Sequence, residues 1–401
     1  MPTRLIAGVA ALAFTLLAAA AEPGFYTTQF PNRPSVPALT ALGRALFMDT
    51  SLAASGRMSC ASCHDPAQAY GPPNDRAVQL GGPALQLAGV RAVPSLRYLQ
   101  GVPTFTEHFF DSDGNDSEDQ GPAGGHNWDG RAASVHEQAS LPLLSPFEMA
   151  NTSEGEVVKR LARGPSAALF RATLGDKVLA DPALAFKGVV LALEVFQQSP
   201  ADFYPYDSKY DAFLRGKARL SAQEERGLTL FNSPAKGNCA ACHPGSVKGG
   251  AFPNFTDFGF VAVGVPRNPA IPANRRAGYY DMGLCGPART DLADHVEYCG
   301  RFRTPTLRNV ATRRVFFHNG AFHTLEQVMA FYAQRDSQPA RWYPTKNGRP
   351  DKFNDLPPAL RDNVNSEPPF GARPGDRPAL NADEIADVIA FLNTLTDGYR
   401  P

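Results

Sequence analysis

The chain has 401 residues, of which 43% are hydrophobic and 19% are charged. This balance excludes an intrinsically disordered protein, and the length suggests two or three domains. Lys and Arg together number 39, as do Asp and Glu, so the net charge is zero and no nucleic-acid footprint is expected. The 35 Gly and 36 Pro residues indicate short helices joined by long ordered loops, which a large buried cofactor would help to pack.

The first residues have the features of an export signal. Arg4 precedes an apolar run over 5–17, and this run ends in the small residues of 18–21. The pattern predicts a signal peptide over 1–21, with an uncleaved anchor as the alternative. No later segment has 18 consecutive apolar residues. We therefore expect an exported, periplasmic protein with no membrane span after signal removal, in a compartment where thiols are oxidised.

Four of the six cysteines lie in two C-x-x-C-H motifs, formed by Cys60, Cys63 and His64 and by Cys239, Cys242 and His243. This spacing is typical of c-type haem attachment, because two thiols on one turn can add to two haem vinyl groups while the histidine reaches the iron. A redox dithiol or a zinc site is the alternative for a single motif, but zinc needs four close ligands and neither motif has a second C-x-x-C nearby. The sequence predicts two covalently bound haems c, with both histidines as iron ligands.

The remaining two cysteines, Cys285 and Cys299, enclose a polar segment. In an oxidising compartment, a disulfide that closes this loop is favoured over metal or haem ligation by these thiols. We expect this disulfide in the mature protein.

A repeat of about 180 residues organises the chain. The pattern G-x-x-L-F begins at Gly43 before the first haem motif and again at Gly227 before the second. A capping box at Ser221 opens the helix before the second motif, and an amphipathic helix begins at Asn381. Because strand signals are scarce, we expect a mainly α fold of two cytochrome c-like haem domains with long ordered loops, an N-terminal domain over 22–205 and a C-terminal domain over 206–401.

Further motifs follow the first haem motif in order: W-D-G-R-A at 128–132, E-Q-A at 137–139, S-P-F-E-M at 145–149, T-P-T-L-R-N-V at 304–310 and F-H-N-G at 317–320. Together with the haem motifs, they resemble the bacterial di-haem cytochrome c peroxidase family, including its MauG-type branch. The resemblance covers almost the whole chain after the signal peptide.

The resemblance implies that the haem held by His64 is the peroxidatic one. Its distal residues would be Gln138, Pro142 and Glu148. A carboxylate suits this position because it can take a proton from one peroxide oxygen and return it to the leaving oxygen; an exposed acid after Ser145–Pro146 is the alternative. Trp128 would relay electrons between the haems, a role compatible with core packing.

The resemblance also implies that the haem held by His243 transfers electrons. Tyr332 stands where peroxidases of the family have a Met ligand, which is the MauG-type departure; a core aromatic, with Met329 as the ligand, is the alternative. A phenolate would stabilise oxidised iron and lower its potential. Arg303 and Arg308 resemble the family arginines near haem propionates, and a surface role is the alternative for either.

The resemblance implies a hydrogen-peroxide-dependent oxidoreductase that draws electrons from a small cytochrome or from a protein substrate. A di-haem electron carrier without peroxide turnover and a peroxide sensor are the alternatives. Calcium is a candidate third cofactor, with the acidic segment 111–119 as its binding site. The spacing of the acidic residues fits no EF-hand, however, so a solvated loop is favoured. His108 or His126 could cap the first haem at rest, against the simpler interpretation of a surface histidine.

Overall fold

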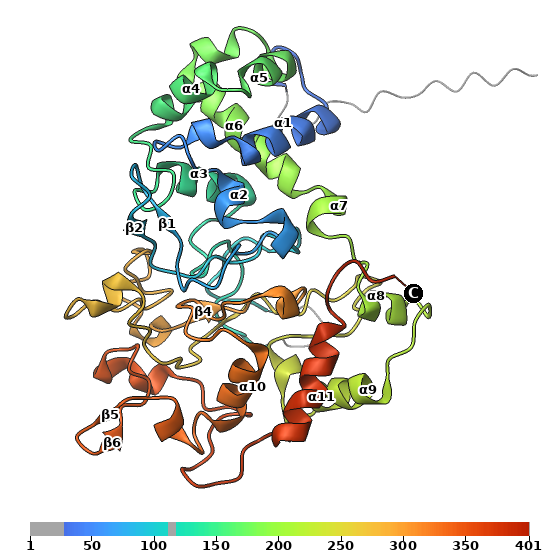
Figure 1. The fold of residues 1–401 in the computed structure, drawn as a ribbon, viewed down its shortest axis with the longest axis vertical. Helices are drawn as coiled ribbons and strands as arrows, with labels where there is room; N and C mark the ends of the chain where they lie inside the picture. The colour runs from blue at the N-terminus through green and yellow to red at the C-terminus, as the bar shows by residue number, and fades with distance from the viewer. Residues whose placement is uncertain (1–27, 111–117, 401) are drawn as a thin grey trace, which may run out of the picture.

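The computed structural model describes residues 28–110 and 118–400, so the predicted signal peptide and most of the acidic segment lie outside the described residues (Figure 1). The described chain is mainly helical with few strands, as predicted. Its α-helices are α1 (Val36–Met48), α2 (Cys60–Cys63), α3 (Val135–Leu144), α4 (Glu154–Arg163), α5 (Ala167–Leu174), α6 (Pro182–Gln197), α7 (Pro200–Phe203), α8 (Lys209–Leu214), α9 (Ala222–Asn232), α10 (Leu325–Gln334) and α11 (Ala382–Asn393).

Each strand has two residues, and the strands form antiparallel two-stranded sheets. The pairs are β1 (Leu80–Gly81) with β2 (Leu87–Ala88), β3 (Phe260–Val261) with β4 (Phe302–Arg303), and β5 (Thr345–Lys346) with β6 (Arg349–Pro350). Long loops and 3₁₀ turns connect these elements.

Two large hydrophobic cores follow one another along the chain. The first joins buried residues between Phe30 and Phe203, and the second joins buried residues between Tyr210 and Leu395. In Figure 1 the helices of the first core occupy the upper part of the molecule and those of the second core the lower part. Each core contains one C-x-x-C-H motif at its edge.

The G-x-x-L-F repeat marks the same helix crossing in both cores. A Cβ on Gly43 of α1 would lie 1.9 Å from the carbonyl oxygen of Ala192 in α6, and a Cβ on Gly227 of α9 would lie 2.0 Å from the carbonyl oxygen of Asp387 in α11. Only glycine permits such close backbone approach. The sequence prediction of a helix beginning after Asn381 is confirmed, since its side chain caps α11.

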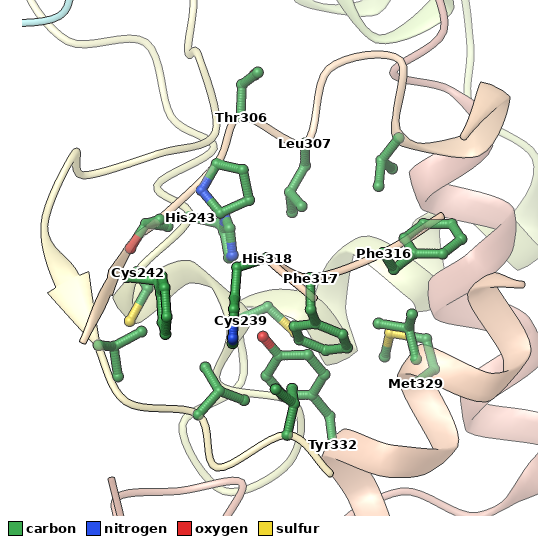
Figure 2. Close-up of a pocket in the computed structure, with 18 of the residues that line it drawn as sticks. Cys239, Cys242, His243, Thr306, Leu307, Phe316, Phe317, His318, Met329 and Tyr332 are labelled. Carbon is green, nitrogen blue, oxygen red and sulfur yellow. The ribbon is translucent and has the colours of Figure 1, made fainter. Parts of the chain in front are cut away.

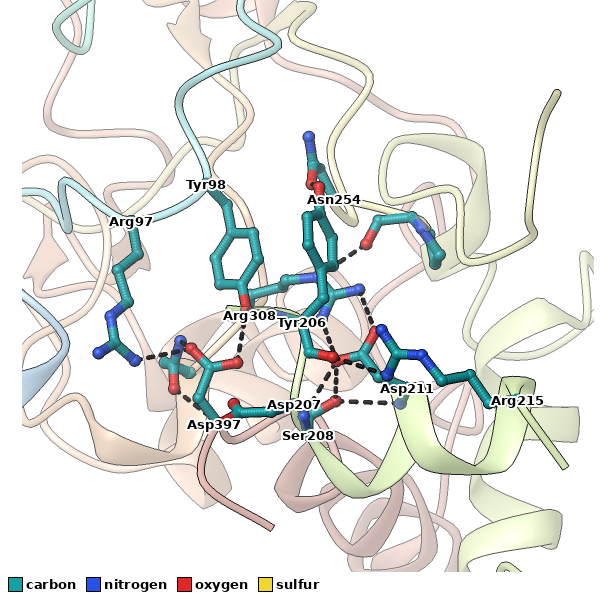
Figure 3. A network of polar contacts seen from close by, with 12 residues as sticks. Arg97, Tyr98, Tyr206, Asp207, Ser208, Asp211, Arg215, Asn254, Arg308 and Asp397 are labelled. Atoms are coloured by element: carbon teal, nitrogen blue, oxygen red, sulfur yellow. Dashed lines mark hydrogen bonds and ion pairs between the residues drawn. The ribbon is translucent and has the colours of Figure 1, made fainter. Parts of the chain in front are cut away.

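A buried polar network joins the N-terminal half, the connecting segment and the C-terminus (Figure 3). Asp397 accepts hydrogen bonds from the Tyr98 hydroxyl at 2.5 Å and from Arg97 Nη1 at 2.7 Å. Beside it, Arg308 forms a two-pronged ion pair with Asp211, at 2.7 and 2.9 Å, and both side chains are fully buried. These contacts fix the two cores against each other.

A second group of ion pairs lies at the other side of the same junction. Arg91 donates from Nε and Nη2 to Asp281, both at 2.7 Å, and from Nη1 to Asp129 at 2.6 Å. Nearby, Cys285 and Cys299 form a disulfide, which confirms the prediction for this pair.

Candidate functional site

The first C-x-x-C-H motif forms the short helix α2 and the residue that ends it. Ser59 opens α2 with a capping box, and His64 follows its last turn. The His64 Nδ1 lies 3.1 Å from the carbonyl oxygen of Tyr70. In the tautomer that donates this hydrogen bond, Nε2 keeps its lone pair for a metal. Burial, and more weakly the charge of Arg313, lower the pKa of His64 to about 4, which favours the neutral imidazole that can ligate iron.

The second motif repeats this arrangement. His243 Nδ1 lies 2.8 Å from the carbonyl oxygen of Phe255, so its Nε2 is also free for a metal. Burial lowers the pKa of His243. Tyr70 and Phe255, which supply the two carbonyl groups, both have positive φ angles, of 55° and 54°. Both motifs therefore orient their histidine through a backbone carbonyl in the same strained conformation.

The four motif thiols do not resemble a redox pair. Burial raises the pKa of Cys60, Cys63 and Cys239 to about 12 and that of Cys242 to about 11. Redox-active C-x-x-C pairs instead have a lowered thiol pKa, which supplies the reactive thiolate. The described residues also contain no group of three or more His, Cys, Asp or Glu side chains able to hold a metal ion alone. Haem attachment is the chemistry that fits these thiols.

A cavity of about 410 Å³ adjoins the second motif and extends to the junction with the N-terminal half. Its walls are mostly apolar, and its lining includes Trp128, Cys239, Cys242, His243, Arg303, Arg313, Phe317, Met329 and Tyr332. A flat apolar group that carries two carboxylates fits this cavity, because Arg303 and Arg313 are cations without a carboxylate hydrogen-bond partner among the described residues.

Tyr332, rather than Met329, faces the second motif. Figure 2 shows the Tyr332 hydroxyl pointing toward Cys239, while Met329 lies on the other side of Phe317. Met329 is buried in the second core. Burial, followed by the nearby thiols of Cys242 and Cys239, raises the pKa of the Tyr332 phenol. The hydroxyl therefore lies on the side of α10 that faces the motif thiols.

Glu148, the expected distal acid, lies near the thiols of the first motif. Burial, and then the charge of Glu148, raise the pKa of Cys63, so the carboxyl and the thiol are close. Although the residue keeps an exposed surface, protein atoms around its carboxyl raise the pKa of Glu148 by desolvation, against a hydrogen bond from Ser145. The backbone also holds the position, since Gly82 N donates to the Glu148 carbonyl oxygen at 2.8 Å. A carboxyl with a raised pKa holds a proton more firmly than an ordinary glutamate, which suits proton exchange with a substrate.

Gln138 and Pro142 lie on α3, which leads into this turn. Both side chains are half-buried, and they are separated by one helical turn, so they share one face of α3. The Pro142 carbonyl oxygen accepts from Met149 N at 3.1 Å, which ties the helix to the residue after Glu148. The three expected distal residues thus belong to one continuous helix-and-turn unit.

Trp128 and Arg303 lie together at the cavity wall. Trp128 Nε1 donates to the Ala92 carbonyl oxygen at 2.8 Å, and Arg303 N donates to the Trp128 carbonyl oxygen at 2.8 Å. The Arg303 guanidinium has one hydrogen bond, from Nε to the Asn127 carbonyl oxygen at 3.2 Å. Burial lowers the pKa of Arg303 to about 10, against the opposing effect of the nearby Asp129 charge. This arrangement leaves donors for an anion in the cavity.

The sequence predicts a propionate contact for both Arg303 and Arg308, but the two side chains have different hydrogen-bond partners in the structure. Arg308 pairs with Asp211 through Nη1 and Nη2, and its Nε donates to the Pro253 carbonyl oxygen at 2.8 Å. This geometry favours a structural role at the junction over a propionate contact. Arg313, which sequence analysis did not single out, has the unpaired guanidinium instead; the only signal for it was a basic doublet after the T-P-T-L-R-N-V motif.

The two candidate capping histidines have different surroundings. His108 is exposed and lies 2.6 Å from Asp119. His126 is 4% exposed and lines a separate small cavity with Ser134 and Glu194. The acidic residues 111–117 of the candidate calcium segment lie outside the described residues.

Comparison with known proteins decides the family. A model described as di-haem cytochrome c peroxidase matches residues 37–219. The chain is 34% identical over 388 residues to the methylamine utilization protein MauG of Paracoccus denitrificans, covering 92% of this chain and 91% of that protein. The chain belongs to the di-haem cytochrome c peroxidase family. This result confirms the resemblance that the sequence motifs predicted.

Other members of the family extend the comparison. The cytochrome c551 peroxidase of Nitrosomonas europaea is 27% identical, over 98% of this chain and 92% of that protein. The crystal structure of the diheme peroxidase BthA from Burkholderia thailandensis is 39% identical with a TM-score of 0.79, and it covers 91% of this chain and 87% of that one. The chain is thus a peroxide-dependent oxidoreductase of a family with two c-type haems. Among the helices of 28–110 and 118–400, none has the length and apolar character to cross a membrane.

Proposed function

We propose that this protein is a periplasmic, MauG-like di-haem peroxidase in which the two haem sites have different roles. A domain over 22–205 would use hydrogen peroxide at the haem of Cys60, Cys63 and His64. A domain over 206–401 would draw electrons, through the haem of Cys239, Cys242 and His243, from a small cytochrome or a protein substrate. The observation that carries this proposal is the asymmetry of the sites: a carboxyl with a raised pKa lies near the first motif, and the half-buried phenol of Tyr332 points toward the second.

The first site would act through Glu148. A haem bound there supplies the iron that polarises the O–O bond of peroxide. Glu148 accepts a proton from one peroxide oxygen and donates it to the other as that oxygen leaves. Desolvation raises the pKa of Glu148, which makes the return of the proton easier than it would be from a carboxylate with an ordinary pKa. Gln138 and Pro142, one helical turn apart on α3, orient peroxide and exclude excess water.

At the second site, Tyr332 would hold the haem iron together with His243. The phenol is half-buried, and desolvation and the nearby motif thiols raise its pKa, so only a strong electrostatic partner such as ferric iron would displace its proton. A phenolate ligand favours the oxidised metal. Trp128, at the cavity wall between the halves, would carry electrons between the sites, and Arg303 would hold a propionate.

The experiment compares Glu148→Gln with Glu154→Gln in the fully assembled protein. Both changes remove one carboxylate, but Glu154 is an exposed residue at the start of α4. Mass spectrometry should show two covalent haems in each variant. We expect Glu148→Gln to slow the reaction with peroxide by roughly 10² to 10⁴, the usual effect of a lost general base, and Glu154→Gln to react like the wild type.

An unchanged peroxide rate in Glu148→Gln would remove this residue from the mechanism. If the wild type with two haems does not react with peroxide at all, the di-haem electron carrier becomes the correct description. One haem or none in the mature protein would contradict the cofactor assignment itself.

A further inference from the structure

Arg313 is an arginine in the junction between the two halves that has no acidic partner among residues 28–110 and 118–400. Its Nε donates to the Val315 carbonyl oxygen at 3.2 Å, and its Nη2 donates to the Val93 carbonyl oxygen at 3.0 Å. No hydrogen bond from Nη1 is present, and the side chain lines the large cavity. Burial alone lowers the pKa of its guanidinium to about 10.

This lack of a partner is unusual within the same protein. Four arginines in the described residues have buried side chains and an aspartate partner each: Arg91 with Asp281, Arg289 with Asp291, Arg308 with Asp211 and Arg335 with Asp336. A buried cation costs free energy unless an anion compensates it. Arg303 and the half-buried Arg313 both line the cavity and have no carboxylate hydrogen-bond partner among the described residues. Arg313 bonds to Val93, next to Pro94 in the part of the cavity wall that the N-terminal half supplies, so its anion is expected at this end, beside the first motif.

The position of Arg313 connects the two haem motifs. Its backbone belongs to the segment that continues to Phe316 and Phe317, in the wall of the cavity of the second motif. Its side chain reaches the N-terminal half, where Val93 precedes the Pro94 backbone that hydrogen-bonds to His64. Nη1 would be 3.6 Å from a Cβ on Gly71, the neighbour of the Tyr70 carbonyl that orients His64. The charge therefore comes from the second half and acts on the first site.

We propose that Arg313 is a propionate-binding residue: its guanidinium receives a carboxylate of the haem at the first motif, and its charge raises the reduction potential of that haem. This inference depends on the proposed two-haem function. A planar guanidinium with a free edge matches a carboxylate in a two-pronged pair. Because a nearby positive charge destabilises the ferric state more than the ferrous state, its removal makes reduction harder. Arg313 is thus a positioning and tuning residue of the first site, supplied by the second half.

The test measures the reduction potentials of both haems by spectroelectrochemical titration in wild type, Arg313→Gln, Arg313→Lys and Arg314→Gln. Arg314 is the adjacent, exposed arginine, so its variant loses the same charge at the surface. Loss of a unit charge at a distance on the order of 10 Å, with an effective dielectric constant of about 20, changes an equilibrium by about tenfold. For a one-electron couple this equals about 59 mV.

In Arg313→Gln, we expect the reduction potential of the first haem to fall by this amount and that of the second haem to fall by less. In Arg313→Lys, the potential of the first haem should be near that of the wild type, and in Arg314→Gln it should be unchanged. Equal first-haem potentials in Arg313→Gln and Arg314→Gln would overturn the proposal. If Arg313→Gln does not assemble, Arg313→Lys decides: two attached haems and a near-normal potential support the proposal, and loss of the first haem despite the retained charge overturns it. The titration contains no peroxide, so a protein inert to peroxide would still give these potentials.

Discussion

Replacing Gly227 by Ala tests the helix crossing that closes the second haem site. The new Cβ would lie 2.0 Å from the carbonyl oxygen of Asp387 and 2.9 Å from Cβ of Phe391, so α9 and α11 must separate by a distance on the order of 1 Å. The obstacle is backbone, which cannot rotate away as a long side chain can. Since Val388 and Leu392 of α11 line the cavity, this separation reaches the haem site directly.

Two opposing effects set the size of the change. Alanine gains about 1 kcal/mol over glycine in a helix interior. Overpacking of a close contact costs about 1–3 kcal/mol, and the upper end applies where the backbone must move. We expect a net loss of about 2 kcal/mol, which corresponds to a melting temperature about 4–8 °C lower for a unit of this size. The absorption spectrum of the second haem should change with it.

The matched control is Gly155→Ala in α4. A Cβ on Gly155 would meet only Ser153 Oγ, at 3.7 Å, so the same substitution has no steric cost there and should stabilise the protein by about 0.5 kcal/mol. Thermal unfolding followed by circular dichroism gives both values, with mass spectrometry to confirm haem attachment. If Gly227→Ala melts with or above Gly155→Ala, the close crossing is not rigid and the reasoning fails.

Two further predictions concern the rings of His126 and Tyr332. Burial, and then the charge of Arg303, lower the pKa of His126 to about 4 from its ordinary 6.5; the unfolded chain therefore binds the proton first as pH falls, and stability should decrease from about pH 6.5 to 4, by up to about 3 kcal/mol. Urea unfolding across this range should show the loss, and His126→Gln should flatten it. Replacing Tyr332 by Phe should change the electron paramagnetic resonance spectrum of the second haem, whereas Met329→Leu should not; the reverse result would make Met329 the ligand.

Local signals in the sequence were sufficient for much of the frame. The G-x-x-L-F repeat predicted two related halves. It could be read from the sequence because its glycine and its phenylalanine are only one helical turn apart. Capping chemistry is also local, and the structure confirms the predicted caps of Ser221 for α9 and Asn381 for α11. The disulfide between Cys285 and Cys299 followed from compartment and cysteine count.

The roles of the arginines could not be predicted in this way. Arg308 and Arg313 are five residues apart and equal in charge, but only the fold places Asp211 beside the first and leaves the second facing the cavity. The pairing partner lies 97 residues away in the chain, so no local pattern reports it. Sequence motifs could suggest Arg308 by resemblance. Only the three-dimensional structure shows that Arg313 has no acidic partner among the described residues.

The proposed function assigns two chemically different sites to one repeated scaffold. In both halves a glycine-mediated helix crossing and a backbone carbonyl orient the motif histidine, so the frame itself makes no distinction between the haems. In the proposed function the distinction comes from single side chains added to that frame, a carboxyl at Glu148 and a phenol at Tyr332. Because each lies in a turn or helix outside the repeated crossing, either could change without disturbing the crossing. Differences in reactivity between the two sites should then follow these side chains and the charge of Arg313, and not differences in fold.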